Sequence, residues 1–143
     1  MQVQLITFFK SDSNINRGIF NSLQKLDVPI KNFVKKHPNF ESDPSISQDY
    51  SKKFIKYLQS IFSSDDPPDL LVIDEINIAL FDGIVKKSNF LDLLDDRPEN
   101  MDIVMTGRNA PPKLLEKAHL ISKIVEEKHY YKRGVKARKG IEF

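Results

Sequence analysis

The sequence contains neither cysteine nor tryptophan, and the first of these absences excludes several kinds of site. Without cysteine there is no disulfide, no thiolate nucleophile and no thiolate metal ligand. No apolar run approaches the roughly 18 residues of a membrane-spanning helix, and no basic stretch precedes the first apolar segment as in a secretory signal. An excess of one charge is also missing, because the formal net charge is only +2. We therefore expect a cytoplasmic protein whose overall charge demands neither a membrane nor a nucleic acid.

The chain of 143 residues has an ordinary composition, 40% hydrophobic and 29% charged, which suits a single domain over residues 1–143. Apolar runs predict strands at 3–9, 30–34, 70–75, 101–109 and 120–131. Helical spacing of apolar residues predicts helices at 14–26 and 45–62, a short helix ending before Pro98, and another opening at 111–118. This alternation predicts an α/β fold in three layers, with a mainly parallel sheet flanked by helices.

Two of the predicted strands end in residues that suit a chemical site. The run LLVI leads directly into Asp74 and Glu75, and the run DIVM leads into a polar turn formed by Thr106, Gly107, Arg108 and Asn109. Ligands of parallel sheets bind beyond the carboxyl ends of the strands. A carboxylate pair suits Mg²⁺, and the turn offers a hydroxyl, a close backbone approach and a guanidinium for phosphate oxygens. A structural interpretation stays open, in which Asp74 caps the next helix and pairs with Arg108.

The second half of the chain contains three stretches, in the order LLVIDEINIAL, RPENMDIVMTGRNAPPKLLEKAHL and KHYYKRGVKARKGIEF. Their order and spacing resemble the P-loop type of ATP:corrinoid adenosyltransferases. That family has an acidic strand end of the form D-E-(I/L)-(N/T), then R-P-x-x, T-G-R, K-H and a closing G-(V/I)-K-A-x-x-G-I-(E/D)-(F/Y). Near the start, VQLITFFKS is similar to the second strand of the family, so the resemblance covers most of the chain.

The resemblance implies a P-loop-NTPase-like fold that moves the 5′-deoxyadenosyl group of ATP onto the reduced cobalt of a corrinoid, with Mg²⁺ assisting. On this basis Asp74 and Glu75 are the catalytic and metal-binding pair. Phe40 occupies the place of an aromatic residue that packs against the corrinoid. We also expect a homodimer. The nucleotide phosphates would be bound by Thr106, Gly107, Arg108, Asn109 and, in the basic tail, Lys136.

One motif of that family does not occur in these 143 residues. None of the five glycines lies in a G-x-x-x-x-G-K-[ST] loop, whose backbone amides and lysine cradle phosphates. The expected fold therefore lacks the first strand and its phosphate loop, and that strand would lie beside the one ending at Thr106. We expect the segment 120–131, or a second copy of the chain, to cover the open edge.

Three functions stay open at this point. The chain is a working adenosyltransferase whose phosphate loop comes from elsewhere, or a non-catalytic relative that acts as a corrinoid-binding, partner or regulatory subunit. The third possibility is a nucleic-acid binder that uses KHYYKRGVKARKG, where tyrosines interleave with basic residues. The low net charge and the resemblance of this same tail to the family make the third the least favoured.

Overall fold

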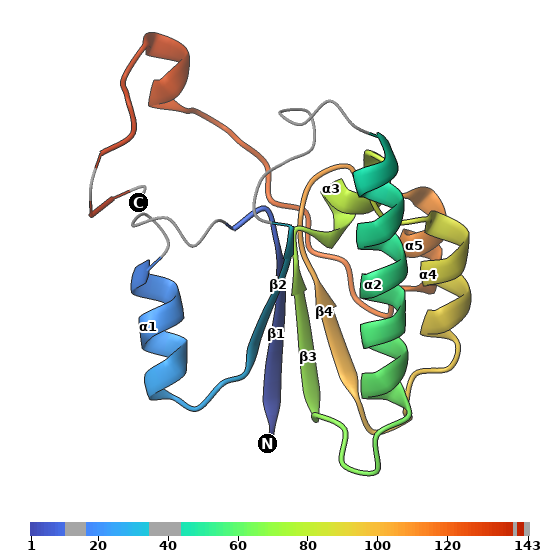
Figure 1. Ribbon diagram of the computed structural model, residues 1–143. Helices are drawn as coiled ribbons and strands as arrows, with labels where there is room; N and C mark the ends of the chain where they lie inside the picture. The colour runs from blue at the N-terminus through green and yellow to red at the C-terminus, as the bar shows by residue number, and fades with distance from the viewer. Residues whose placement is uncertain (11–16, 35–43, 139, 142–143) are drawn as a thin grey trace.

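The computed structural model describes residues 1–10, 17–34, 44–138 and 140–141, and its centre is a sheet of four parallel strands (Figure 1). The strands are β1 (Val3–Phe8), β2 (Ile30–Val34), β3 (Leu70–Asp74) and β4 (Asp102–Met105), in the order β2-β1-β3-β4. All three pairings between neighbours are parallel. Their apolar composition is typical of strands that lie between two covering layers. The predicted α/β fold with a parallel sheet is confirmed.

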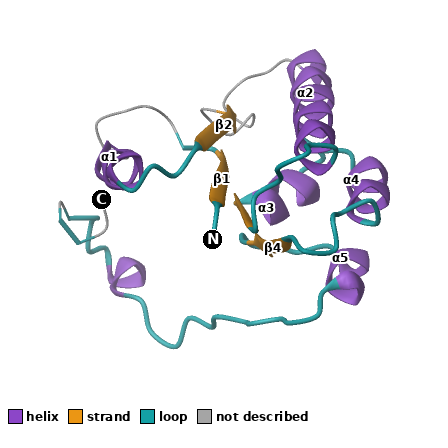
Figure 2. Cartoon of the chain, turned by 90° about the horizontal axis from the view of Figure 1, so that it is seen from below, coloured by secondary structure: helices purple, strands orange, loops and turns teal. Residues whose placement is uncertain are grey.

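Helices lie on both faces of this sheet (Figures 1 and 2). On one face lie α2, α3 and α4, with α5 beside α4, whereas α1 lies on the opposite face. The bounds are α1 (Arg17–Lys25), α2 (Pro44–Phe62), α3 (Ile76–Phe81), α4 (Lys87–Leu94), α5 (Pro112–Lys117) and a short 3-10 helix, η2 (Tyr130–Arg133). No helix in the described ranges has the length and apolar character needed to cross a membrane.

The hydrophobic core lies between the sheet and the layer of α2, α3 and α4. Phe8 of β1 and Phe54 of α2 are fully buried and meet edge to face, with ring centroids 5.1 Å apart. The ring centroid of Phe33 in β2 lies 5.3 Å from that of Phe54, and Phe33 completes an aromatic cluster. Such rings bury large apolar areas, so this cluster joins two strands and the longest helix into one unit.

The opposite face of the sheet is less well covered. Side chains alternate along a strand, so Leu5, Val72 and Val104, which are in register on neighbouring strands, lie side by side on this face. Val104 is 47% exposed, and a hollow of about 630 Å³ lies between α1 and β2. One step nearer the carboxyl ends, Thr7 and Asp74 are also in register and bring polar groups to this face.

The predicted strand at 120–131 is wrong. This part of the chain runs as a loop from α5 to η2, which Figure 2 shows apart from the strands, and Ile124 is 97% exposed. Its apolar residues fall in adjacent pairs rather than alternating, so no face of a strand would be consistently apolar. They are Leu120, Ile121, Ile124 and Val125. The segment therefore does not cover the edge of β4 as expected, and cover by a second copy stays a prediction.

Candidate functional site

Asp74, the last residue of β3, and Thr106, which follows β4, are joined by one hydroxyl at the carboxyl end of the sheet. Oγ1 of Thr106 donates a hydrogen bond to Oδ1 of Asp74 at 2.7 Å and accepts one from the backbone N–H of Glu75 at 3.1 Å. The backbone N–H of Thr106 donates to the carbonyl of Ile73 at 3.2 Å. These bonds fix the two strand ends, and with them the Asp74 carboxylate, relative to each other.

A second link joins the turn after β4 to the first residues of α3. The backbone N–H of Asn77 donates to the Thr106 carbonyl at 3.2 Å, and its side-chain amide donates to the Gly107 carbonyl at 3.4 Å. Gly107 has a φ of 122°, and a Cβ there would lie 3.1 Å from Cβ of Asn77 and 3.3 Å from Cα of Glu75. The glycine in the T-G-R motif is therefore strongly favoured, because a side chain there would be strained at this φ and would crowd the turn after β3.

Glu75 has a strained backbone and a carboxylate oxygen without a partner. Its φ of 63° and ψ of 17° are left-handed, a conformation that costs a non-glycine residue about 1–2 kcal/mol. Oε2 is buried and has no hydrogen-bond partner among the described residues. Strained residues and unsatisfied polar atoms occur preferentially at functional sites. Glu75 rather than Asp74 precedes α3 as its N-cap, and no side chain caps that helix.

The ion pair of Asp74 is formed with Lys10, which follows β1. Nζ of Lys10 lies 3.5 Å from Oδ2 of Asp74, and the two side chains are 32% and 29% exposed. The alternative in which Asp74 pairs with Arg108 is not what the described residues show. The sequence interpretation missed Lys10, although it carries the signal that identified Asp74, a charged residue directly after a predicted strand.

The remaining predicted site residues are not gathered into this cluster. Arg108 and Asn109 are exposed on the turn after β4, and Lys136 is exposed on the tail beyond η2. In Figures 1 and 2 that tail lies apart from the strand ends. In the loop before η2, a hydrogen bond from Lys132 of η2 lowers the pKa of the exposed Glu126 carboxyl. Phe40 lies outside the described residues.

The acidic residues at the strand ends suit one kind of metal ion. No group of three or more histidine or carboxylate side chains that could enclose a metal occurs in the ranges that the structure describes. Mg²⁺ usually keeps several waters and is held by one or two carboxylates together with substrate phosphates. Two neighbouring carboxylates, one with a buried oxygen lacking a partner, fit that coordination.

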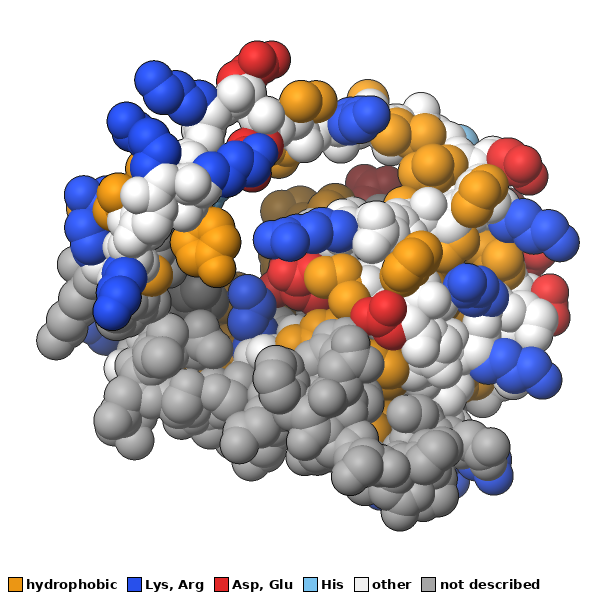
Figure 3. All heavy atoms as spheres, turned by 90° about the horizontal axis from the view of Figure 1, so that it is seen from above, with side chains coloured by type: hydrophobic (Ala, Val, Ile, Leu, Met, Phe, Trp, Pro, Cys, Tyr) orange, Lys and Arg blue, Asp and Glu red, His pale blue; other side chains and the backbone are white. Residues whose placement is uncertain are grey.

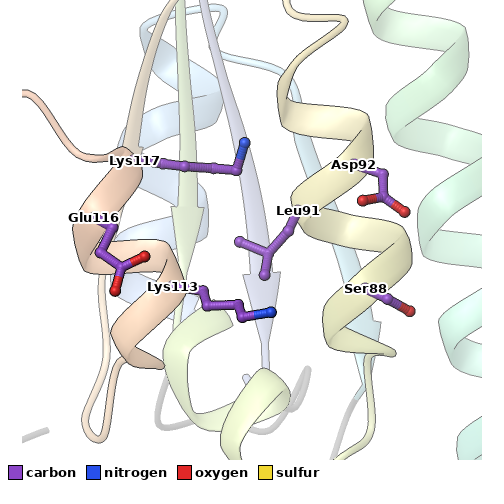
Figure 4. A pocket seen from close by; sticks show the side chains of 6 residues that line it. All are labelled: Ser88, Leu91, Asp92, Lys113, Glu116 and Lys117. Carbon is purple, nitrogen blue, oxygen red and sulfur yellow. The ribbon is translucent and has the colours of Figure 1, made fainter.

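A shallow hollow of about 450 Å³ between α4 and α5 contains none of these residues (Figure 4). Its side chains include charges of both signs, and Lys117 is already paired with Asp95. The lining residues are Ser88, Leu91, Asp92, Lys113, Glu116 and Lys117. This hollow therefore does not match the charge pattern that a polyphosphate needs.

Residues 1–143 match the sequence model of the family described as ATP:corrinoid adenosyltransferase BtuR/CobO/CobP. The chain belongs to this family. The corrinoid adenosyltransferases of Pseudomonas aeruginosa, a Sinorhizobium species and Escherichia coli K12 are 39%, 38% and 28% identical to it over 80 residues. The alignments cover 56%, 55% and 56% of this chain but only 39%, 37% and 41% of those relatives. The resemblance to the adenosyltransferase family is confirmed, and the aligned part spans about two-fifths of each relative.

Proposed function

We propose that this chain takes part in the transfer of the 5′-deoxyadenosyl group of ATP to the reduced cobalt of a corrinoid. In this reaction the cobalt supplies both electrons of the new cobalt–carbon bond, the bond between C5′ and oxygen breaks, and triphosphate leaves with the electron pair. Membership of the adenosyltransferase family supports the reaction type. The observation that carries the proposal is the hydrogen-bonded cluster of Asp74, Glu75 and Thr106 at the carboxyl edge of the sheet.

In this proposal the chain positions a magnesium triphosphate. Asp74 and Glu75 would hold Mg²⁺ directly or through water, and bound Mg²⁺ would neutralise charge on the leaving triphosphate. Thr106 keeps the Asp74 carboxylate in place, and the backbone of Gly107, whose turn packs against Asn77, would contact a phosphate. The guanidinium of Arg108, on its exposed turn, would bind phosphate oxygens in a fork. The contribution of the chain is thus orientation and electrostatics, while the nucleophile is the cobalt itself.

The proposal also gives roles to residues away from the strand ends. Asn109 and Lys136 would add contacts to the nucleotide, and Phe40 would pack against the corrinoid. A homodimer would cover the edge of β4, where Val104 is exposed. The cytoplasmic location also stays a prediction.

An adenosylation assay tests the proposal. The purified chain is mixed with Mg-ATP and a chemically reduced corrinoid, and the light-sensitive absorbance of the cobalt–carbon product is followed. We expect product from the parent chain, a large loss with Asp74→Asn and Glu75→Gln, and no change with Glu116→Gln on the exposed side of α5. A parent chain that binds the corrinoid but never converts it would support a non-catalytic relative instead. If the parent chain neither binds the corrinoid nor forms the product, both functions are contradicted.

A further inference from the structure

The backbone of Lys10 is held at the end of β1 by contacts from β2. A left-handed turn at Phe9 (φ 62°) ends the strand, and the N–H of Phe9 donates to the Val34 carbonyl at 2.6 Å. The side-chain amide of Asn32 donates to the carbonyl of Lys10. Because the neighbouring strand fixes its backbone, the side chain of Lys10 extends from a defined position beside Asp74.

The contact between Lys10 and Asp74 is loose. Nζ and Oδ2 are 3.5 Å apart, longer than the roughly 2.7–2.9 Å of a strong charge-assisted hydrogen bond. Both side chains keep about a third of their exposure, at 32% and 29%, and the other oxygen of Asp74 is taken by Thr106. An ion pair this long and this exposed contributes little to stability. The ammonium can therefore change partners at little cost.

Thr7 provides a second, independent indication that a ligand lies here. It is in register with Asp74 and only 3% exposed, yet its hydroxyl has no hydrogen-bond partner among the described residues. Its neighbours Ile6 and Phe8 face the core, so Thr7 lies on the same face of the sheet as Asp74. Figure 3 shows this end of the molecule, with acidic and basic side chains close together beside an opening under the tail. A ligand oxygen beside Lys10 would satisfy the buried hydroxyl.

We propose that Lys10 is a polyphosphate-binding residue whose ammonium exchanges Asp74 for a ligand phosphate. Two carboxylates repel a polyphosphate, and binding of Mg²⁺ to them removes the attraction that holds Lys10 at Asp74. The ammonium, a mobile point charge on a flexible stem, then turns to a phosphate oxygen. Among the described residues, Lys10 is the cation in contact with Asp74, and the 143 residues contain no P-loop lysine. The identification of the ligand as a nucleoside triphosphate rests on the proposed function. The exchange of partners by Lys10 needs only Mg²⁺ and a polyphosphate.

Replacing the ammonium should have opposite effects on two ligands, which a merely structural lysine would not produce. Lys10→Met keeps the stem and removes the charge. We expect it to bind Mg²⁺ alone severalfold more tightly, because a cation beside Asp74 is gone. It should bind Mg-tripolyphosphate roughly 10- to 100-fold more weakly, because a charge-assisted hydrogen bond is lost. Both affinities are measured by NMR titration of the ¹⁵N-labelled chain, which also reports whether the fold is retained.

Two further variants complete the test. Lys25→Met makes the same change in net charge at an exposed position at the end of α1 and should alter neither affinity. Lys10→Arg keeps the charge and should keep the Mg-tripolyphosphate affinity of the parent chain even if Lys10→Met folds poorly. Parallel changes in both affinities, effects equal to those of Lys25→Met, or no polyphosphate binding by the parent chain would overturn the proposal. Opposite effects in a chain that transfers no adenosyl group would uphold Lys10 and reject the proposed function.

Discussion

Backbone strain is concentrated in residues that follow the carboxyl ends of the strands. Phe9 after β1, Glu75 after β3 and Asn109 on the turn after β4 have φ values of 62°, 63° and 58°. At Phe9 and Glu75 the left-handed conformation costs about 1–2 kcal/mol each, a large amount compared with the roughly 5–15 kcal/mol of a typical domain, whereas asparagine tolerates it better. The aromatic core must offset this cost. Strain at the same edge as a carboxylate with an unpartnered oxygen is what a ligand-binding edge would show.

The close approach at Gly107 predicts an unusually damaging alanine substitution. In Gly107→Ala the new Cβ would lie 3.1 Å from Cβ of Asn77 at a φ of 122°, so both strain and a collision oppose it. Gly83→Ala is the matched control, because φ is 73° there but nothing lies within 4 Å. We expect the control to lose about 1 kcal/mol of unfolding free energy and Gly107→Ala to lose about 2–4 kcal/mol. Urea unfolding of both variants measures the difference. Equal losses of unfolding free energy would contradict the close contact between Gly107 and Asn77.

Substitutions at Glu75 and Arg108 should affect ligand binding more than folding. Oε2 of Glu75 has no partner among the described residues, and Arg108 is exposed, so neither substitution strands a buried partner charge. Glu75→Gln and Arg108→Ala should each change the unfolding free energy by less than about 0.5–1 kcal/mol. A buried ion pair would instead cost about 3–5 kcal/mol when one partner is removed. Thermal melts with and without Mg-tripolyphosphate distinguish a ligand site from a structural ion pair. A large loss of melting temperature in both variants, with no effect of the ligand on the parent chain, would reject the site.

Among the elements, the loop from α5 to η2 should be the part of the described chain that opens most easily. Leu120 and Ile124 are 86% and 97% exposed, and the segment pairs with no described strand. Local opening is easiest where few apolar contacts and few shielded backbone hydrogen bonds exist. We expect amides of 120–128 to exchange within seconds while those of β3, between β1 and β4, stay protected. Hydrogen exchange followed by mass spectrometry tests this, and protection of 120–128 equal to that of β4 would restore the predicted strand.

The elements that could be predicted from the sequence are those with an uninterrupted apolar signal. β2 was predicted at its observed bounds, and α2 and β3 were predicted within a residue, because runs such as LLVI have no alternative exposed arrangement. The apolar content of 120–131 favours a strand, but its apolar residues fall in adjacent pairs and do not alternate as one face of a strand requires. At the site, Asp74 and Thr106 were identified by their positions at strand ends. Lys10 could not be linked to Asp74 without the strand order, which places β1 beside β3.

For the whole molecule, the open edge of β4 predicts self-association. The segment expected to cover this edge lies elsewhere, and Val104 is 47% exposed beside unpaired backbone groups. Such an edge pairs readily with another strand. We expect a dimer in analytical ultracentrifugation, and a shift towards monomer with Val104→Lys. Leu26→Lys, at an apolar residue 71% exposed after α1, is the control and should leave the dimer intact. A parent chain that stays monomeric at all concentrations would contradict this prediction.

The affinity of the 143-residue chain for Mg-ATP is set by the cations it can bring to the phosphates. A phosphate loop supplies several charge-assisted hydrogen bonds of about 1.5–3 kcal/mol each, and losing two weakens binding by about two to four orders of magnitude. The sequence contains no such loop. The strand ends offer two cations, Lys10 in contact with Asp74, and Arg108 outside that cluster on the exposed turn after β4. We therefore expect a dissociation constant near or above about millimolar in a calorimetric titration. A low-micromolar value would contradict this and indicate a substitute site in the basic tail. In that case Lys136→Ala should weaken binding, whereas Lys25→Ala, which removes an equal charge at the end of α1, should not.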